Sequence, residues 1–212
     1  MQYWSFAGVA DDAHRDAIRR LPVSYDLTVI PLRPMGWERP KTFGHVHVSP
    51  TAPDAGFPEL YEVLEGHAGF LVQDLRAGPR ATFSALIEAS PGDTVIIPPL
   101  LHHVTINLGD VPLVVADVVC RASDDDYGQL RAAHGMAHYI GTDLQAIQNP
   151  RYAAVPPLTR VAAGRWSARQ YLPVYATLTN DPAALSWLCS PDEFASEFPA
   201  LWQQITLGVE PQ

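Results

Sequence analysis

The chain has 212 residues, a formal net charge of −9 and a single lysine, Lys41. This acidic balance argues against nucleic acids and anionic membrane surfaces as partners. The length suits one domain, or one domain with an appendage, and 20 prolines among many short apolar runs favour a β-rich fold with many turns.

The two cysteines, Cys120 and Cys189, lie in apolar stretches and are too few for a disulfide framework. The sequence has no apolar run long enough to span a bilayer, and its start does not resemble a signal peptide. We therefore expect a cytoplasmic protein with both thiols reduced and no membrane partner.

The first third of the chain predicts a short helix followed by strands. Residues 4–21 indicate a helix that Asp11 or Asp12 can cap, with Ile18 and Leu21 on its apolar side. Eight strand-like runs then follow at short intervals: 25–32, 41–48, 60–66, 67–75, 80–89, 93–99, 102–109 and 112–120. The sequences LEGHAG and EASPGD between them are typical of hairpin turns. Eight strands with such turns predict a sandwich or a barrel.

The pattern changes after the last of these strands. A polar stretch contains Asp124, Asp125 and Asp126 as candidate helix caps, and a proline-rich, irregular stretch begins near residue 149. Two further helices are predicted from Asp181 and from Ser190, each with proline next in the chain. The second would carry one apolar face made of Phe194, Phe198, Leu201, Trp202 and Ile205. We expect a barrel unit over 1–155 and an extension over 156–212 that covers the barrel or forms a subunit interface.

His45 and His47 are the residues on which the functional interpretation depends. In a strand, side chains two apart share a face, so both imidazoles would point the same way and form half of a metal site. The alternative is two polar residues on a solvated face. His103 has the same alternation with His102, which should point to the opposite side.

The spacing of other residues supplies the rest of such a site. Glu59 and Gly66 follow the histidine pair, and Gly92, Pro98, His103 and Asn107 come later. These spacings resemble the two sequence motifs of the cupin family, which implies a β-barrel or jelly roll with short peripheral helices and a helical C-terminal tail. The resemblance implies one divalent metal held by four ligands: His45, His47, Glu59 and His103. Two departures are that Leu100 stands where the motif has glycine, and that eleven residues, interpreted as a surface loop, separate His47 from Glu59.

A narrower resemblance covers residues 20–155. DLTVIP, KTFGHVH, PELYEVLEG, PPLLHHVTINLGD, DYG and NPRY occur in the order found in cupin-type glucose-6-phosphate isomerases. That likeness implies a sugar phosphate substrate, and commonly a homodimer. It implies phosphate contacts from Thr28, Thr42, Gly44 and Tyr127, and a sugar contact from Tyr61. The alternatives are ordinary strand threonines and a core tyrosine.

The chemistry of an aldose–ketose isomerase fits these residues. A metal with open coordination positions polarises a sugar oxygen, and Glu59 is the carboxylate closest to it by motif position. Glu59 could act as a base through an enediol, or a hydride could shift directly. Tyr61 and His103 complete the catalytic candidates. The ligand set suits Fe, Mn, Ni, Co or Zn. Two alternatives remain open: another cupin metalloenzyme, of dioxygenase or epimerase type, and a non-catalytic sugar-binding cupin.

Overall fold

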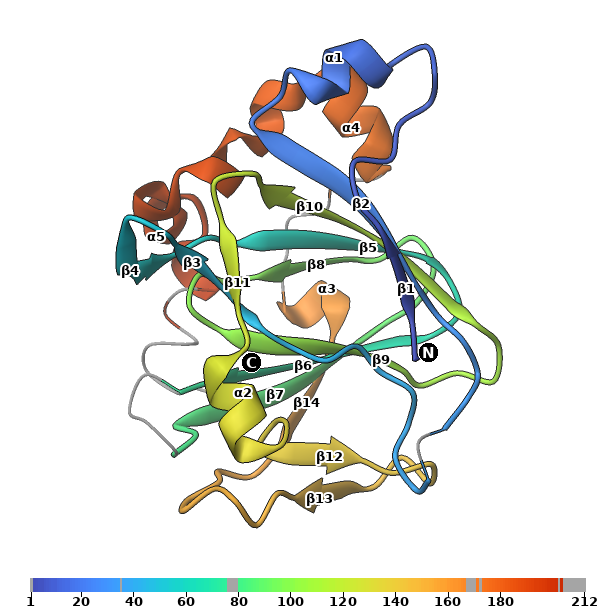
Figure 1. Ribbon diagram of the computed structural model, residues 1–212, viewed down its shortest axis with the longest axis vertical. Coiled ribbons are helices and arrows are strands. Elements are labelled where there is room, and N and C mark those ends of the chain that lie inside the picture. The colour runs from blue at the N-terminus through green and yellow to red at the C-terminus, as the bar shows by residue number, and fades with distance from the viewer. Residues whose placement is uncertain are drawn as a thin grey trace.

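The computed structural model describes residues 2–34, 36–75, 80–166, 171, 173–201 and 203. Antiparallel strands dominate it, and its helices are short (Figure 1). The strands are β1 Trp4–Phe6, β2 Val23–Ile30, β3 Val46–Ser49, β4 Ala52–Gly56, β5 Glu59–Glu65, β6 Ala68–Asp74, β7 Phe83–Ala89, β8 Thr94–Ile97, β9 His102–Asn107, β10 Leu113–Cys120, β11 Asp124–Asp126, β12 His138–Ile140, β13 Ala146–Gln148 and β14 Thr159–Ala162. The helices are α1 Arg15–Arg19, α2 Gly128–Ala133, α3 Ala163–Trp166, α4 Val174–Asn180 and α5 Phe194–Glu197, with two 3₁₀ helices, η1 Pro182–Cys189 and η2 Pro191–Glu193. The predicted all-β barrel with short peripheral helices and a helical tail is confirmed, and each of the eight predicted runs overlaps a strand.

Two main sheets enclose the core. One has the strand order β1-β2-β10-β5-β8 and the other β14-β7-β6-β9. Apolar side chains from both sheets, such as Val115 and Phe70, are fully buried in one cluster between them. A third sheet, β11-β3-β4, continues from the edge of β9 through a bridge between His45 and His103. This join brings the two distant histidine motifs side by side.

The two predicted hairpins are wrong. β5 pairs with β10 and β8, whereas β6 pairs with β7 and β9, so the turn at LEGHAG carries the chain from one sheet to the other. EASPGD does the same between β7 and β8. Both are corners of the barrel, which need the same turn residues as a hairpin.

Three local expectations also need correction. Helix α1 begins only at Arg15 and has no side-chain cap, while Asp11 instead accepts a hydrogen bond from the amide of Ala13. The insert after His47 is more than a loop, because it contains strand β4, which pairs with β3. Asp124–Asp126 form strand β11 against β3, although the Asp126 carboxylate does accept a hydrogen bond from Gly128 N at the start of α2.

The chain beyond residue 156 returns to the barrel. Strand β14 adds to β7 in parallel, the Trp166 indole donates a hydrogen bond to the carbonyl oxygen of Ile96, and the Val174 amide donates one to the Glu62 carboxylate. Helices α4 and α1 lie together at one end of the molecule (Figure 1). The segment predicted from Asp181 forms the 3₁₀ helix η1, and the one predicted from Ser190 begins as η2 and continues as the short helix α5.

The predicted apolar face of the tail is partly visible. Phe194, Phe198 and Leu201 are buried in the main core cluster. Trp202 and Ile205 lie outside the described residues. A second, smaller cluster lies on the outer side of the four-stranded sheet, where Leu130 of α2 and Tyr152 cover Leu71 and Leu86.

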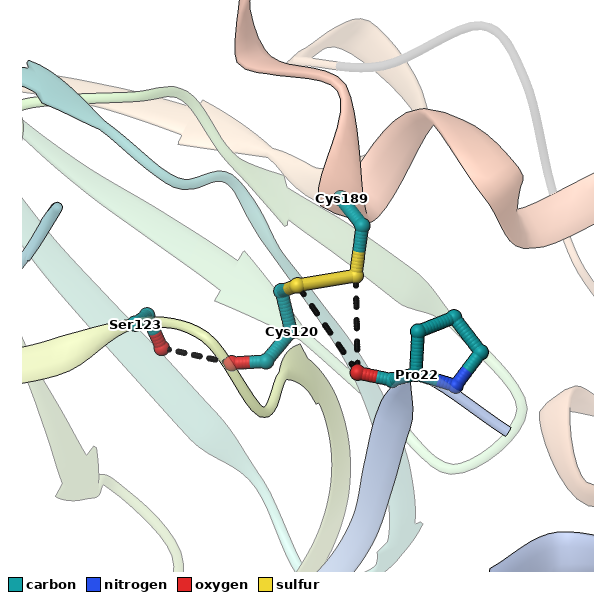
Figure 2. The surroundings of a disulfide bond; sticks show 4 residues. All are labelled: Pro22, Cys120, Ser123 and Cys189. Atoms are coloured by element: carbon teal, nitrogen blue, oxygen red, sulfur yellow. Dashed lines mark hydrogen bonds between the residues drawn. A yellow bond between two sulfur atoms is a disulfide. The ribbon is translucent and has the colours of Figure 1, made fainter. Parts of the chain in front are cut away.

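Cys120 and Cys189 form a disulfide, so the expectation of two reduced thiols is wrong. The bond joins the end of β10 to the end of η1, with 5.1 Å between the Cα atoms (Figure 2). Both sulfur atoms contact the carbonyl oxygen of Pro22, at 3.7 and 3.5 Å. The tail is therefore tied covalently to the strand that follows the second histidine motif. None of the described helices is long and apolar enough to cross a membrane.

Candidate metal centre

The first pair of histidines is held by β3 and by its junction with β9. His45 lies just before β3, and its amide donates a hydrogen bond to the carbonyl oxygen of His103 at 3.1 Å, which His103 returns at 2.9 Å. Gly44 precedes this pair with φ of +87°, and a Cβ there would lie 3.0 Å from the same carbonyl oxygen. Glycine at this position therefore allows β3 to approach β9 closely enough to bring the rings together.

Glu59 completes the cluster from the other sheet. It is the first residue of β5, and β10 and β8 pair with it on either side. Its Oε2 lies 3.0 Å from Nε2 of His47 and 2.8 Å from Nε2 of His103, and Nε2 of His45 is 3.2 Å from Nε2 of His47. One ligand atom from each of these four residues lies within 4.8 Å of the others. The structure thus brings together the complete predicted ligand set.

The orientation of the rings fits a cation. Nδ1 of His103 lies 3.2 Å from the carbonyl oxygen of Leu101, so it donates the proton of the neutral ring and leaves the lone pair of Nε2 available to a cation. This Nε2 is buried and makes no satisfactory hydrogen bond within the described part of the chain. Three imidazoles and one carboxylate that face each other in this way are a donor set for a divalent transition metal.

The charges within the cluster are strongly coupled. Burial, together with the neighbouring His103 and His47, lowers the pKa of His45 to about 3. Burial would also lower the pKa of His47, but Glu59 and Asp125 outweigh it and raise that pKa to about 10. Burial would raise the pKa of Glu59, and the two adjacent imidazoles hold it well below its usual range. Without a metal, one proton at His47 thus offsets the carboxylate, and a bound cation would replace that proton.

The cluster forms one wall of a cavity of about 190 Å³. Four strands from the five-stranded sheet and the segment before β3 supply most of the other walls. The lining residues are Tyr3, Ser5, Asp26, Thr28, Thr42, His45, His47, Glu59, Tyr61, Thr105, Asp117, Val119, Asp125 and Tyr127. The cavity therefore offers several hydroxyl groups beside the candidate metal.

Most predicted substrate contacts lie in this cavity. Thr28, Thr42, Tyr61 and Tyr127 line it, whereas Gly44 does not. The Tyr61 hydroxyl hydrogen-bonds to Glu59 and Thr105, and burial with the nearby Glu59 and Asp117 carboxylates raises the pKa of Tyr61 well above its usual value. Tyr61 is therefore a proton donor held directly against the metal-facing carboxylate.

Histidines outside the cluster are arranged differently. His102 points away from His103 and is buried among the residues of the outer sheet face, beside its partner in β6, Gln73. Both of its ring nitrogens make no hydrogen bond to described residues. His138 lies 3.1 Å from the Ser84 hydroxyl and does not line the cavity.

Sequence reasoning missed three carboxylates. Asp117 of β10 lies beside its register partner Asp26, and both line the cavity. An acid within the apolar run PLVVADVVC was a usable signal, because a charge is costly at a fully buried strand position. Asp125 was assigned to a helix cap, yet its Oδ1 lies 3.2 Å from Nδ1 of His47 and its Oδ2 accepts a hydrogen bond from the Tyr127 hydroxyl at 2.9 Å.

The barrel and its cluster of three histidines and one glutamate define a cupin with a candidate metal centre. A family model described as glucose-6-phosphate isomerase (GPI) matches residues 2–156. The chain therefore belongs to the glucose-6-phosphate isomerase family.

Individual relatives agree with this assignment. The chain is 24% identical over 165 residues to a glucose-6-phosphate isomerase from Thermococcus onnurineus, which covers 69% of this chain and 82% of the relative. It is 26% identical over 164 residues to one from Thermococcus gammatolerans, with 68% and 81% covered. A solved cupin superfamily protein from Desulfitobacterium hafniense is similar with a TM-score of 0.35 and 15% identity, over 56% of this chain and 77% of that one.

Proposed function

We propose that the chain interconverts glucose 6-phosphate and fructose 6-phosphate at the cavity beside its metal cluster. One observation carries the proposal: the four ligand side chains converge, and three of them line a cavity whose other walls present hydroxyl groups. The family assignment supports the same reaction. No described residue of this site favours the alternatives, which are a dioxygenase, an epimerase and a non-catalytic sugar-binding cupin.

His45, His47, Glu59 and His103 would hold one divalent ion. Bound there, such an ion polarises the carbonyl oxygen of an open-chain sugar. In their neutral form the three imidazoles bring no charge, and the carboxylate brings one negative charge. A divalent ion held by these ligands would keep a net positive charge, which favours negative charge on the sugar oxygens. Fe, Mn, Ni, Co and Zn all suit this set of ligands.

We assign proton transfer to Glu59 and Tyr61. Glu59 can take a proton from one sugar carbon, leaving the electron pair in an enediol, and return the proton to the neighbouring carbon, while the hydroxyl of Tyr61 can donate a hydrogen bond to a sugar oxygen. In the other route a hydride moves directly between the carbons, and the same two side chains orient the oxygens. His103 would help to hold the Glu59 carboxylate in position through the contact between its Nε2 and Oε2 of Glu59.

The remaining predicted residues would hold the far end of the substrate. We assign the hydroxyls of Thr28, Thr42 and Tyr127, and the backbone at Gly44, to the phosphate side, since neutral donors match phosphate oxygens geometrically. Binding at that end would orient the reacting carbons at the metal. A homodimer and a cytoplasmic location belong to the proposal, and sedimentation velocity of the oxidised protein tests the first.

The test is a coupled assay in which fructose 6-phosphate is the substrate and glucose 6-phosphate is detected by a dehydrogenase. We expect turnover that a chelator removes and that a first-row divalent metal restores. A preparation that binds one metal per chain, yet turns over no fructose 6-phosphate with any of the five metals, would overturn the proposal. His102→Ala serves as the matched control for His103→Ala, because the two imidazoles are adjacent in the chain and face opposite sides of β9.

A further inference from the structure

A second cavity, of about 390 Å³, adjoins the metal cavity. Thr42 lines both of them, so one wall is shared. The second cavity lies between the segment before β3 and helix α2. Its lining residues are Gln2, Glu38, Lys41, Thr42, Phe43, Leu130, Arg131, His134 and Gly135.

Positive charge is concentrated in this cavity. It contains the only lysine of an acidic chain, Lys41, whose side chain is 14% exposed and whose Nζ lies 3.5 Å from Glu38. Arg131 is a second cation there, and its guanidinium forms no ion pair with any described residue. Glu38 is the one carboxylate among the lining residues and is matched by Lys41, which leaves Arg131 uncompensated.

Arg131 is held in place by aromatic rings rather than by an acid. Its Cζ lies 5.2 Å from the centre of the Tyr127 ring and 5.7 Å from that of Phe43. Contacts of this kind hold a guanidinium in place while its N–H groups stay available to an oxygen ligand. Thr42 adds a donor, since its Oγ1 accepts a hydrogen bond from the Thr105 amide at 3.1 Å and its hydroxyl proton remains free.

The metal cavity has the opposite electrostatic character. Four carboxyl groups line it, from Asp26, Glu59, Asp117 and Asp125, although burial and the neighbouring Glu59 raise the pKa of Asp117 well above its usual value. Its described lining includes no lysine or arginine. A phosphate held by the hydroxyls of Thr28, Thr42 and Tyr127 meets no cationic side chain among the described lining of this cavity. Arg131 and Lys41 lie across Thr42 and can supply the missing positive charge to the same phosphate.

We propose that the cavity of Lys41, Arg131 and Thr42 is an anion site that binds a phosphoryl group. The guanidinium supplies paired N–H donors to two phosphoryl oxygens, and the ammonium supplies a point charge. The phosphoryl group comes either from the substrate, reaching past Thr42, or from a separate phosphate. The first source rests on the proposed isomerase function, whereas the second does not.

Calorimetric titration of the metal-loaded, full-length protein with inorganic phosphate tests the site without any turnover. Arg131→Gln should weaken phosphate binding about tenfold, the effect expected from losing one charge-assisted hydrogen bond. Arg121→Gln is the matched control, because this arginine is exposed, as Arg131 is, but lines neither cavity. The double variant Glu38→Gln/Lys41→Met removes the second cation without leaving a buried carboxylate unpaired, and should also weaken binding.

Kinetics with fructose 6-phosphate then separate the two sources. If the phosphoryl group is that of the substrate, Arg131→Gln lowers kcat/KM about tenfold. If it is a separate phosphate, kcat/KM is unchanged while phosphate binding still weakens. The proposal is overturned if both variants fold, by circular dichroism, and bind phosphate as tightly as the parent and Arg121→Gln. A chain without isomerase activity would still give a decisive titration, so the two failures are distinguishable.

Discussion

Reduction of the Cys120–Cys189 bond should destabilise the protein substantially. The bond spans 69 residues along the chain and closes the tail onto β10. By the chain-entropy relation, a loop of this length restricts the unfolded state by about 4 kcal/mol at 25 °C. Typical domains have a total free energy of unfolding of only about 5–15 kcal/mol, so the change would be large. Tail side chains such as Trp187 and Phe194 stay buried in the core and should hold the reduced native state together.

Denaturant unfolding followed by tryptophan fluorescence measures the effect. The oxidised protein should show a clearly higher midpoint than the same protein in a phosphine reductant, and thiol titration confirms the state of each sample. Cys189→Ser should match the reduced protein and be insensitive to reductant, which serves as the control. Metal content should be unchanged in native buffer, since none of the four ligands comes from the described part of the tail. Equal midpoints and slopes for samples with none and two titratable thiols would refute the reasoning.

Three further predictions concern the metal centre. His103→Ala should lose both metal and turnover and His102→Ala should keep both, as metal analysis and the coupled assay will show; equal losses would contradict the strand register. Asp125→Asn should weaken metal affinity about 10-fold to 100-fold, measured by chelator competition, because its carboxylate lies 3.2 Å from a ligand imidazole. Gly44→Ala should cost about 1–3 kcal/mol in thermal unfolding, and more than Gly92→Ala, which has a similar φ but open space around it.

The three histidine ligands could be predicted because their spacing is a local property of two strand segments. His45 and His47 share a face, and His103 faces them because it alternates with His102. The strand itself was overestimated, since β3 begins only at Val46 and His45 lies in a single bridge before it. The prediction that His45 and His47 share a face is still correct, because the bridge at His45 extends the antiparallel pairing of this segment against β9.

Features that depend on the path of the chain between sheets could not be predicted in this way. The turn sequences after β5 and β7 are compatible with a hairpin or with a corner, and only the partners of each strand decide between them. The disulfide could not be predicted for the same reason. Its cysteines are separated by 69 residues, and nothing near either one in the sequence indicates that the tail returns to β10. Asp125 was misassigned for a related reason: three successive acids are typical of a helix start, and pairing of β11 with β3 overrode that preference.

The longer insert before Glu59 does not disturb the site, and the strand pairing explains why. The inserted residues form their own strand, β4, whose pairing with β3 ends at Gly56, where a Cβ would lie 2.5 Å from the amide nitrogen of Leu100. Glu59 is then positioned by Ile97 and Val119, its partners across β8 and β10, and not by the length of the connection that precedes it. A ligand on a strand that is paired on both sides depends little on the loop before it. The ligand geometry can therefore persist while this connection and the walls of the cavity diverge, which is the pattern expected of a family member at 24–26% identity.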